Sequence, residues 1–182
     1  MPIDLIPLKR DVEAIEIPAG VRRTLPAGTT VRISQFLGNA YTVVTDLGYL
    51  CRVDARDADA LGMTPPEQPE ATPGTFSEQM VWDQLKTVFD PEIPVNIVDL
   101  GLIYACDIAD LGGGKKIDIK MSMTAPGCGM GNVIKADVEG KISHLPDVKQ
   151  VNVEVVFDPP WGPGRMSDAA KLQLGFDLDY GT

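Results

Sequence analysis

The sequence predicts an α+β protein in which a small antiparallel β domain, either a barrel or a sandwich, precedes a domain with the element order α-β-β-α-β. Three observations predict this class. Short β-rich segments separated by turns fill residues 1–64. Residues 65–74 contain four prolines and no apolar periodicity, which is typical of a linker. Residues 75–182 switch between helical spacing and two-residue alternation.

The β domain is predicted from residues 15–17, 29–34, 41–45 and 49–53, which are rich in β-branched and aromatic side chains. Between these segments stand Pro-Ala-Gly at 18–20 and 26–28, and glycines at 38 and 48. Proline fixes φ and glycine permits a positive φ, so these positions favour turns.

The second domain is predicted to begin with a helix that Thr75 caps, because Glu78 stands three residues later as in a capping box. Apolar residues from Val81 to Phe89 share one face of this helix, and the Asp-Pro pair at 90–91 ends it. Strands are expected at residues 102–108 and 116–124, joined by a glycine turn at 112–114. A second helix after Cys128, a strand at 151–157 and a short helix at 167–175 complete the pattern.

Charge and composition exclude several classes of function. The chain has 16 basic and 26 acidic residues, a net charge of −10, which argues against nucleic acid as a partner. No segment approaches the roughly 20 apolar residues that span a bilayer, so we expect a cytoplasmic protein without a membrane partner. Three widely spaced cysteines and one histidine fit neither a disulfide framework nor an ordinary zinc site.

The strongest local signal surrounds Cys128, between a predicted strand and a predicted helix. The supporting residues are Thr124, Gly127, Gly129 and Gly131. Free N–H groups and the positive helix end favour a thiolate, and glycines let the backbone curl around a sulfur, an anion or a metal. The alternative is a glycine-rich turn in which the cysteine is only a small residue.

The other candidates have structural alternatives. The loop at 90–101 carries Asp90, Glu92 and Asp99 as acid/base groups or metal ligands, but we favour a rigid loop in which Asp90 and Asp99 cap backbone donors. Trp161 on a proline-rich loop either forms a partner surface or folds back onto the core.

The remaining cysteines and the histidine are poorer candidates. Cys51 and Cys106 lie inside strand patterns, where cysteine usually behaves as a small hydrophobic residue. His144 stands 16 residues after Cys128, about 24 Å along a helix, which is too far for a Cys–His pair within one chain.

Taken together, these motifs resemble the PaaD/SufT-type iron–sulfur assembly domain. The matching segments are 90–94 with 99–104, 121–124 with 126–131, and 156–161 with 165–167, so the resemblance covers residues 75–176. Residues 35–43 and 57–62 are similar to the N-terminal extension of bacterial SufT proteins. The resemblance thus extends over most of the chain, and the linker at 65–74 separates the predicted domains at 1–64 and 75–182.

The resemblance implies a non-enzymatic accessory factor in iron–sulfur protein maturation, a cluster carrier or targeting adaptor that acts through Cys128. It also implies that Asp90 and Glu92 belong to an acidic motif, that Trp161 and Arg165 form a possible partner surface, and that the partners are assembly proteins and client apoproteins. Stable clusters take about four thiolates, so any cluster would be labile and shared across a homodimer or with a partner. The alternatives are a purely structural adaptor without a cofactor and a thiol enzyme with Cys128 as nucleophile.

Overall fold

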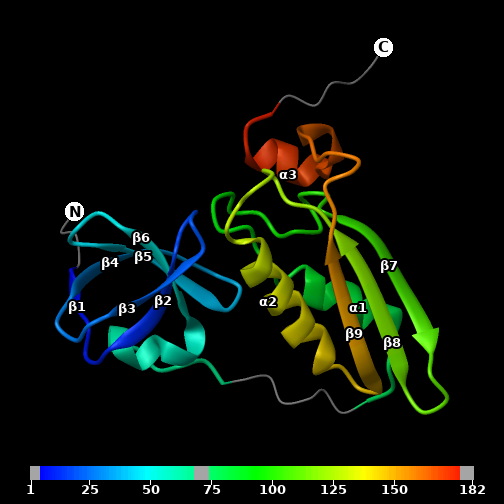
Figure 1. Ribbon diagram of the computed structural model, residues 1–182, viewed down its shortest axis with the longest axis horizontal. Helices are drawn as coiled ribbons and strands as arrows, with labels where there is room; N and C mark the ends of the chain where they lie inside the picture. Colours follow the sequence, from blue (N-terminus) through cyan, green and yellow to red (C-terminus); the bar gives the residue numbers. More distant parts are fainter. Residues whose placement is uncertain (1–4, 68–73, 177–182) are drawn as a thin grey trace. The chain divides into compact units, whose positions relative to one another are not determined.

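The computed structural model describes residues 5–67 and 74–176, and it divides into two compact units (Figure 1). One unit comprises residues 1–70 with 128–133, and the other comprises 71–127 with 134–182. Residues 68–73 of the predicted linker at 65–74 lie outside the described residues. The domain limits given above therefore stay predictions.

The first unit is one six-stranded antiparallel sheet. Its strands are β1 (Ile6–Pro7), β2 (Val12–Glu16), β3 (Val21–Leu25), β4 (Thr30–Leu37), β5 (Ala40–Thr45) and β6 (Leu50–Asp54). They are hydrogen-bonded in the order β1-β4-β5-β6-β2-β3. Among the described residues all six strands thus belong to one antiparallel sheet, so the expected antiparallel β domain is confirmed and its alternative form as a sandwich of two separate sheets is wrong.

The core of this unit contains the side chains of Val31, Val43 and Val53, and the 3-10 helix η1 (Ala55–Leu61) adds Ala58 and Leu61 to it. Four strands were expected: those at 29–34, 41–45 and 49–53 overlap β4, β5 and β6, whereas the one at 15–17 covers only the end of β2. The missed strands, β1 and β3, form the two edges of the sheet. Four of the five residues of β3 are exposed, so no apolar alternation marked this strand in the sequence.

The second unit places helices on one face of a three-stranded sheet. Its elements follow the order α1 (Glu78–Leu85), β7 (Ile103–Asp110), β8 (Lys115–Met121), α2 (Gly131–Ser143), β9 (Val148–Val155), η2 (Pro163–Arg165) and α3 (Asp168–Gln173). The first three residues of α2 are grouped with the first unit. β8 pairs with β7 antiparallel and with β9 parallel. The chain as a whole is α+β.

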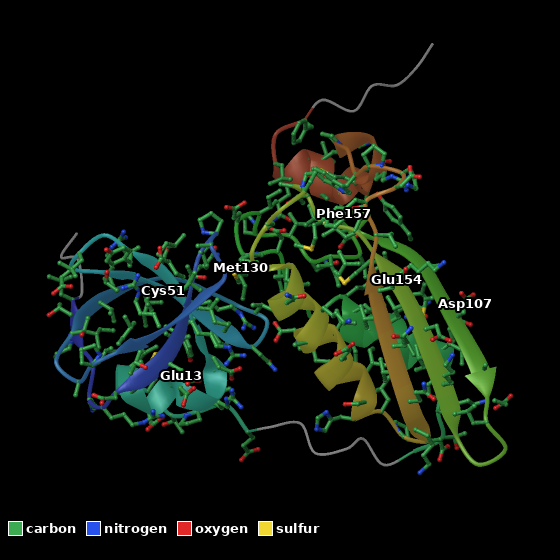
Figure 2. The ribbon with its side chains drawn as sticks, viewed as in Figure 1. Glu13, Cys51, Asp107, Met130, Glu154 and Phe157 are labelled. Carbon is green, nitrogen blue, oxygen red and sulfur yellow. The ribbon has the colours of Figure 1, made fainter. Side chains whose placement is uncertain are left out.

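Alternation along the strands separates the two faces of this sheet. Ile117, Ile119 and Met121 are buried on one face, and the helices contribute the buried side chains that pack on it. Asp107 and Glu154, labelled in Figure 2, belong to the opposite face by their register, and both are exposed. Within the described ranges, no helix has the length and apolar character needed to cross a membrane.

Two expectations about the first helix are wrong. Ser77, not Thr75, caps α1, and its hydroxyl accepts the N–H of Met80 at 3.4 Å. The helix ends at Leu85 rather than at Asp90. The reason lies in Thr87, whose hydroxyl donates to the carbonyl of Gln84 at 2.6 Å and accepts from the ammonium of Lys141 at 2.6 Å. The second helix and the glycine turn at 112–114 are confirmed.

Candidate functional site

Three segments of the chain adjoin the same end of the three-stranded sheet. Met121, the last residue of β8, pairs with Ile103 at the start of β7 and with Val155 at the end of β9. The loop before β7 (86–102), the loop after β8 (122–130) and the segment after β9 (156–176) therefore begin or end together. The motifs that contain Asp90, Cys128 and Trp161 lie in these three segments, which Figure 1 shows near the upper ends of β7, β8 and β9.

Asp90 lies at the centre of the first loop, with a side chain that is almost fully buried. Its Oδ1 accepts the N–H groups of Glu92 and Ile93, both at 2.9 Å, so the expectation that Asp90 caps backbone donors is confirmed. Its Oδ2 lies 3.5 Å from the Thr124 hydroxyl, which donates to it. Burial raises the pKa of Asp90 above its ordinary value, and the three hydrogen bonds oppose that rise.

Asn96 organises the second half of the same loop. Its Oδ1 accepts the N–H groups of Val98 at 3.1 Å and Asp99 at 2.9 Å, and its amide donates to Asp99 Oδ2 at 2.6 Å. The side chain that caps backbone donors here is thus Asn96 and not Asp99. The sequence interpretation missed Asn96, although asparagine two residues before such a turn is a known capping pattern.

The C-terminal segment holds this loop from outside. The indole N–H of Trp161 donates to the carbonyl of Leu100 at 2.7 Å, and the N–H of Ser167 donates to the carbonyl of Asp99 at 2.8 Å. From α3, the amide of Gln173 reaches the carbonyl of Pro94 at 3.1 Å. Of the two expectations for Trp161, the structure supports the one in which the side chain folds back: the indole is part-buried and hydrogen-bonded within its own unit.

Tyr104 and Arg165 stack where the same segment passes β7. Tyr104 lies at an irregularity in the β7–β8 register, its hydroxyl donates to the carbonyl of Pro159 at 2.9 Å, and the Arg165 guanidinium carbon lies 4.2 Å from the centre of its ring. The backbones of Gly101 and Arg165 lie close together: a Cβ added to Gly101 would stand 2.1 Å from the carbonyl oxygen of Arg165. Gly101 also has a φ of +72°, which favours glycine.

Cys128 follows a tight turn in the second loop. Gly127 has a φ of +77° after Pro126, and residues 125–127 are exposed. Cys128 itself is a half-buried free cysteine, and its carbonyl accepts the N–H of Gly131, the first residue of α2, at 3.2 Å. Gly129 is exposed between them. The expected position of the cysteine, between a strand and a helix, is thus confirmed.

The other two thiols are poor ligands. Cys51, labelled in Figure 2, is fully buried in the first unit, and burial raises its pKa. Cys106 shares its sheet face with Ile119, and burial, followed by the charges of Glu78 and Asp107, raises its pKa to about 11. A thiol with a pKa of about 11, such as that of Cys106, is protonated at neutral pH, and the full burial of Cys51 keeps its thiol away from a metal or a partner.

Other potential ligands are dispersed. His144 comes directly after α2 and Cys128 precedes it, so the two residues flank opposite ends of this helix. Glu92 is exposed and Asp99 is half-buried. No group of three or more histidine, cysteine, aspartate or glutamate residues within 5–67 and 74–176 is arranged to hold a metal ion.

Ser122 is the second residue that sequence reasoning missed. It is 1% exposed, its N–H donates to the carbonyl of Leu102 at 2.8 Å, and its hydroxyl has no hydrogen-bond partner in the described part of the chain. Nothing in the sequence distinguishes this serine from one with a satisfied hydroxyl.

Comparison with known proteins identifies the class. A family model described as "Iron-sulfur cluster assembly protein" matches residues 78–155. A protein of Porphyromonas gingivalis, named Fe-S protein maturation auxiliary factor, is 41% identical over 100 residues, which are 55% of this chain and 92% of that protein. The chain belongs to the iron–sulfur cluster assembly protein family.

Two further relatives carry more particular names. The Fe-S protein maturation auxiliary factor SufT of Staphylococcus aureus is 36% identical over 88 residues, which are 48% of this chain and 97% of that protein. An iron-sulfur cluster carrier protein of Deinococcus radiodurans is 31% identical over 70 residues, which are 38% of this chain and 19% of that protein. The resemblance found in the sequence is therefore confirmed for the second half of the chain.

Proposed function

We propose that this protein is a non-enzymatic accessory factor in iron–sulfur protein maturation and that Cys128 is its contact with the cluster. The family assignment and the names of the relatives support the general role. The observation that carries the role of Cys128 is the state of the three thiols. Cys51 is fully buried, and Cys106, although half-buried like Cys128, lies inside β7 with its pKa raised to about 11. Cys128 lies on a turn whose neighbouring residues 125–127 and 129 are exposed.

A single thiolate cannot hold a cluster permanently, because stable clusters generally take about four cysteine ligands. The cluster is thus cargo, held briefly, and its other ligands come from a second copy of the chain, an assembly protein or a client apoprotein. Glu92 is the exposed carboxylate of the acidic motif, and we assign it to contact with these partners. Asp90 is already occupied by its hydrogen bonds.

The test is maturation of an iron–sulfur client enzyme in cells that depend on this protein. Cys128→Ser is expected to lose the ability to support client activity, whereas Cys106→Ala, the matched control for loss of a thiol, is expected to retain it. Both variants should be present at wild-type amounts. Client activity at the wild-type level with Cys128→Ser would refute the role of this cysteine and favour an adaptor that handles no iron.

A further inference from the structure

The Asp90 carboxylate links two of the three loops. Its Oδ1 is used locally, since it accepts the N–H groups of Glu92 and Ile93 at 2.9 Å. Its Oδ2 faces the Thr124 hydroxyl at 3.5 Å, on the loop that follows β8. One oxygen therefore shapes the loop before β7, and the other reaches across to the loop that leads to Cys128.

The hydrogen bond between Asp90 and Thr124 is shielded from water. Asp90 is 2% exposed, so water has little access to compete for its oxygens. A buried carboxylate that loses a donor retains the cost of its desolvation, which makes the Thr124 hydroxyl more valuable than a donor at the surface.

The chain between Thr124 and Cys128 has little freedom. Only Ala125, Pro126 and Gly127 intervene, the proline ring fixes one φ, and Gly127 adopts a φ of +77°. Residues 125–127 are exposed, so side-chain packing contributes little to holding this turn. Anchoring Thr124 therefore limits the positions that Cys128 can take.

We propose that Asp90 and Thr124 are positioning residues, which hold the Cys128 turn through the hydrogen bond between their side chains. The inference rests on the proposed function for the use that the protein makes of Cys128. The positioning itself is measured without iron, so that the two proposals can fail separately.

The test is the alkylation rate of Cys128 in the full chain at neutral pH, measured by mass spectrometry of its peptide. Thr124→Val keeps the shape of threonine and removes the hydroxyl, and Thr124→Ser keeps the hydroxyl. The matched control is Thr87→Val, because Thr87 is also part-buried and hydrogen-bonded, but to Lys141 and Gln84. Thr124→Ala is a second hydroxyl-free variant in case valine prevents folding.

We expect alkylation of Cys128 to be about twofold to tenfold faster in Thr124→Val, the range that corresponds to the loss of one hydrogen bond. Thr124→Ser and Thr87→Val should remain within about twofold of the wild type. Amide exchange at residues 125–130 should follow the same order. Three results would overturn the proposal: an unchanged rate in both hydroxyl-free variants, an equal increase in Thr124→Ser, or an equal increase in Thr87→Val.

Client maturation separates this proposal from the previous one. If Cys128→Ser supports the client fully while Thr124→Val still speeds alkylation, the positioning is correct and the proposed function is wrong. If Cys128→Ser fails and Thr124→Val behaves as wild type in alkylation, the proposed function survives and the positioning is wrong.

Discussion

Substitution of Gly101 tests whether the C-terminal segment presses on the loop before β7. In Gly101→Ala the new Cβ would stand 2.1 Å from the Arg165 carbonyl oxygen, a backbone atom that cannot move without the chain around it. The residue also has a φ of +72°. Gly127→Ala is the matched control, because its φ is +77° and no atom lies within 4 Å of the position that its new methyl group would take.

The magnitudes follow from these two differences. A non-glycine residue with positive φ costs about 1–2 kcal/mol, partly offset by about 0.4–1 kcal/mol from the less flexible unfolded chain. Both variants share this cost. Gly101→Ala adds overpacking of about 1–3 kcal/mol. We therefore expect Gly101→Ala to lower the free energy of unfolding by about 1–3 kcal/mol more than Gly127→Ala does.

The assay is urea unfolding followed by tryptophan fluorescence, which reports on the second unit because both tryptophans, Trp82 and Trp161, belong to it. The slopes of the transitions should agree, so that a shift in midpoint measures stability. Equal free energies of unfolding for the two alanine variants would show that Gly101 and Arg165 are not in close contact, and would refute this description of the site.

Three further results are expected. Burial raises the pKa of Asp90 in the folded protein, so ionisation of Asp90 lowers the free energy of unfolding as pH rises from the ordinary aspartate range through the folded pKa. Unfolding measured across pH should therefore show that the stability of Asp90→Asn relative to wild type increases from acid to neutral pH. A difference that does not change with pH would contradict this. Ser122→Ala removes an unpartnered buried hydroxyl, so thermal unfolding should find it as stable as wild type or up to about 1 kcal/mol more stable, whereas a loss above about 1 kcal/mol would reveal a partner. Iodoacetamide at pH 8 should label Cys128 fastest in the native protein, Cys106 more slowly because its pKa is raised to about 11, and the fully buried Cys51 only after denaturant is added; labelling of Cys51 or Cys106 as fast as that of Cys128 would contradict this order.

The sequence was most informative where local chemistry decides the structure. The α2 helix, the glycine turn and the capping role of Asp90 depend on residues close in the chain, and each was predicted. Other features depend on contacts between distant residues. The end of α1 depends on Thr87 with Lys141 from α2, and the tethering of Trp161 depends on the carbonyl of Leu100, 61 residues away.

The sequence pattern also failed to predict the edge strands of the first sheet. The residues of β3 are mostly polar and solvent-facing, so only their pairing with β2 identifies them as a strand. In the site, the link between Asp90 and Thr124 joins residues 34 positions apart. The motifs marked both residues, but periodicity and spacing contain no information on whether their side chains meet.

The most direct test of the central claim is anaerobic reconstitution with iron and sulfide, comparing wild type with Cys51→Ser, Cys106→Ser and Cys128→Ser by visible absorption and by oligomer mass. We predict a chromophore in wild type that is lost only with Cys128→Ser, together with a dimer that shares the cluster. A chromophore that survives in Cys128→Ser would contradict the claim that Cys128 contacts the cluster, and no chromophore in any form of the protein would contradict a cluster shared between two copies of this chain.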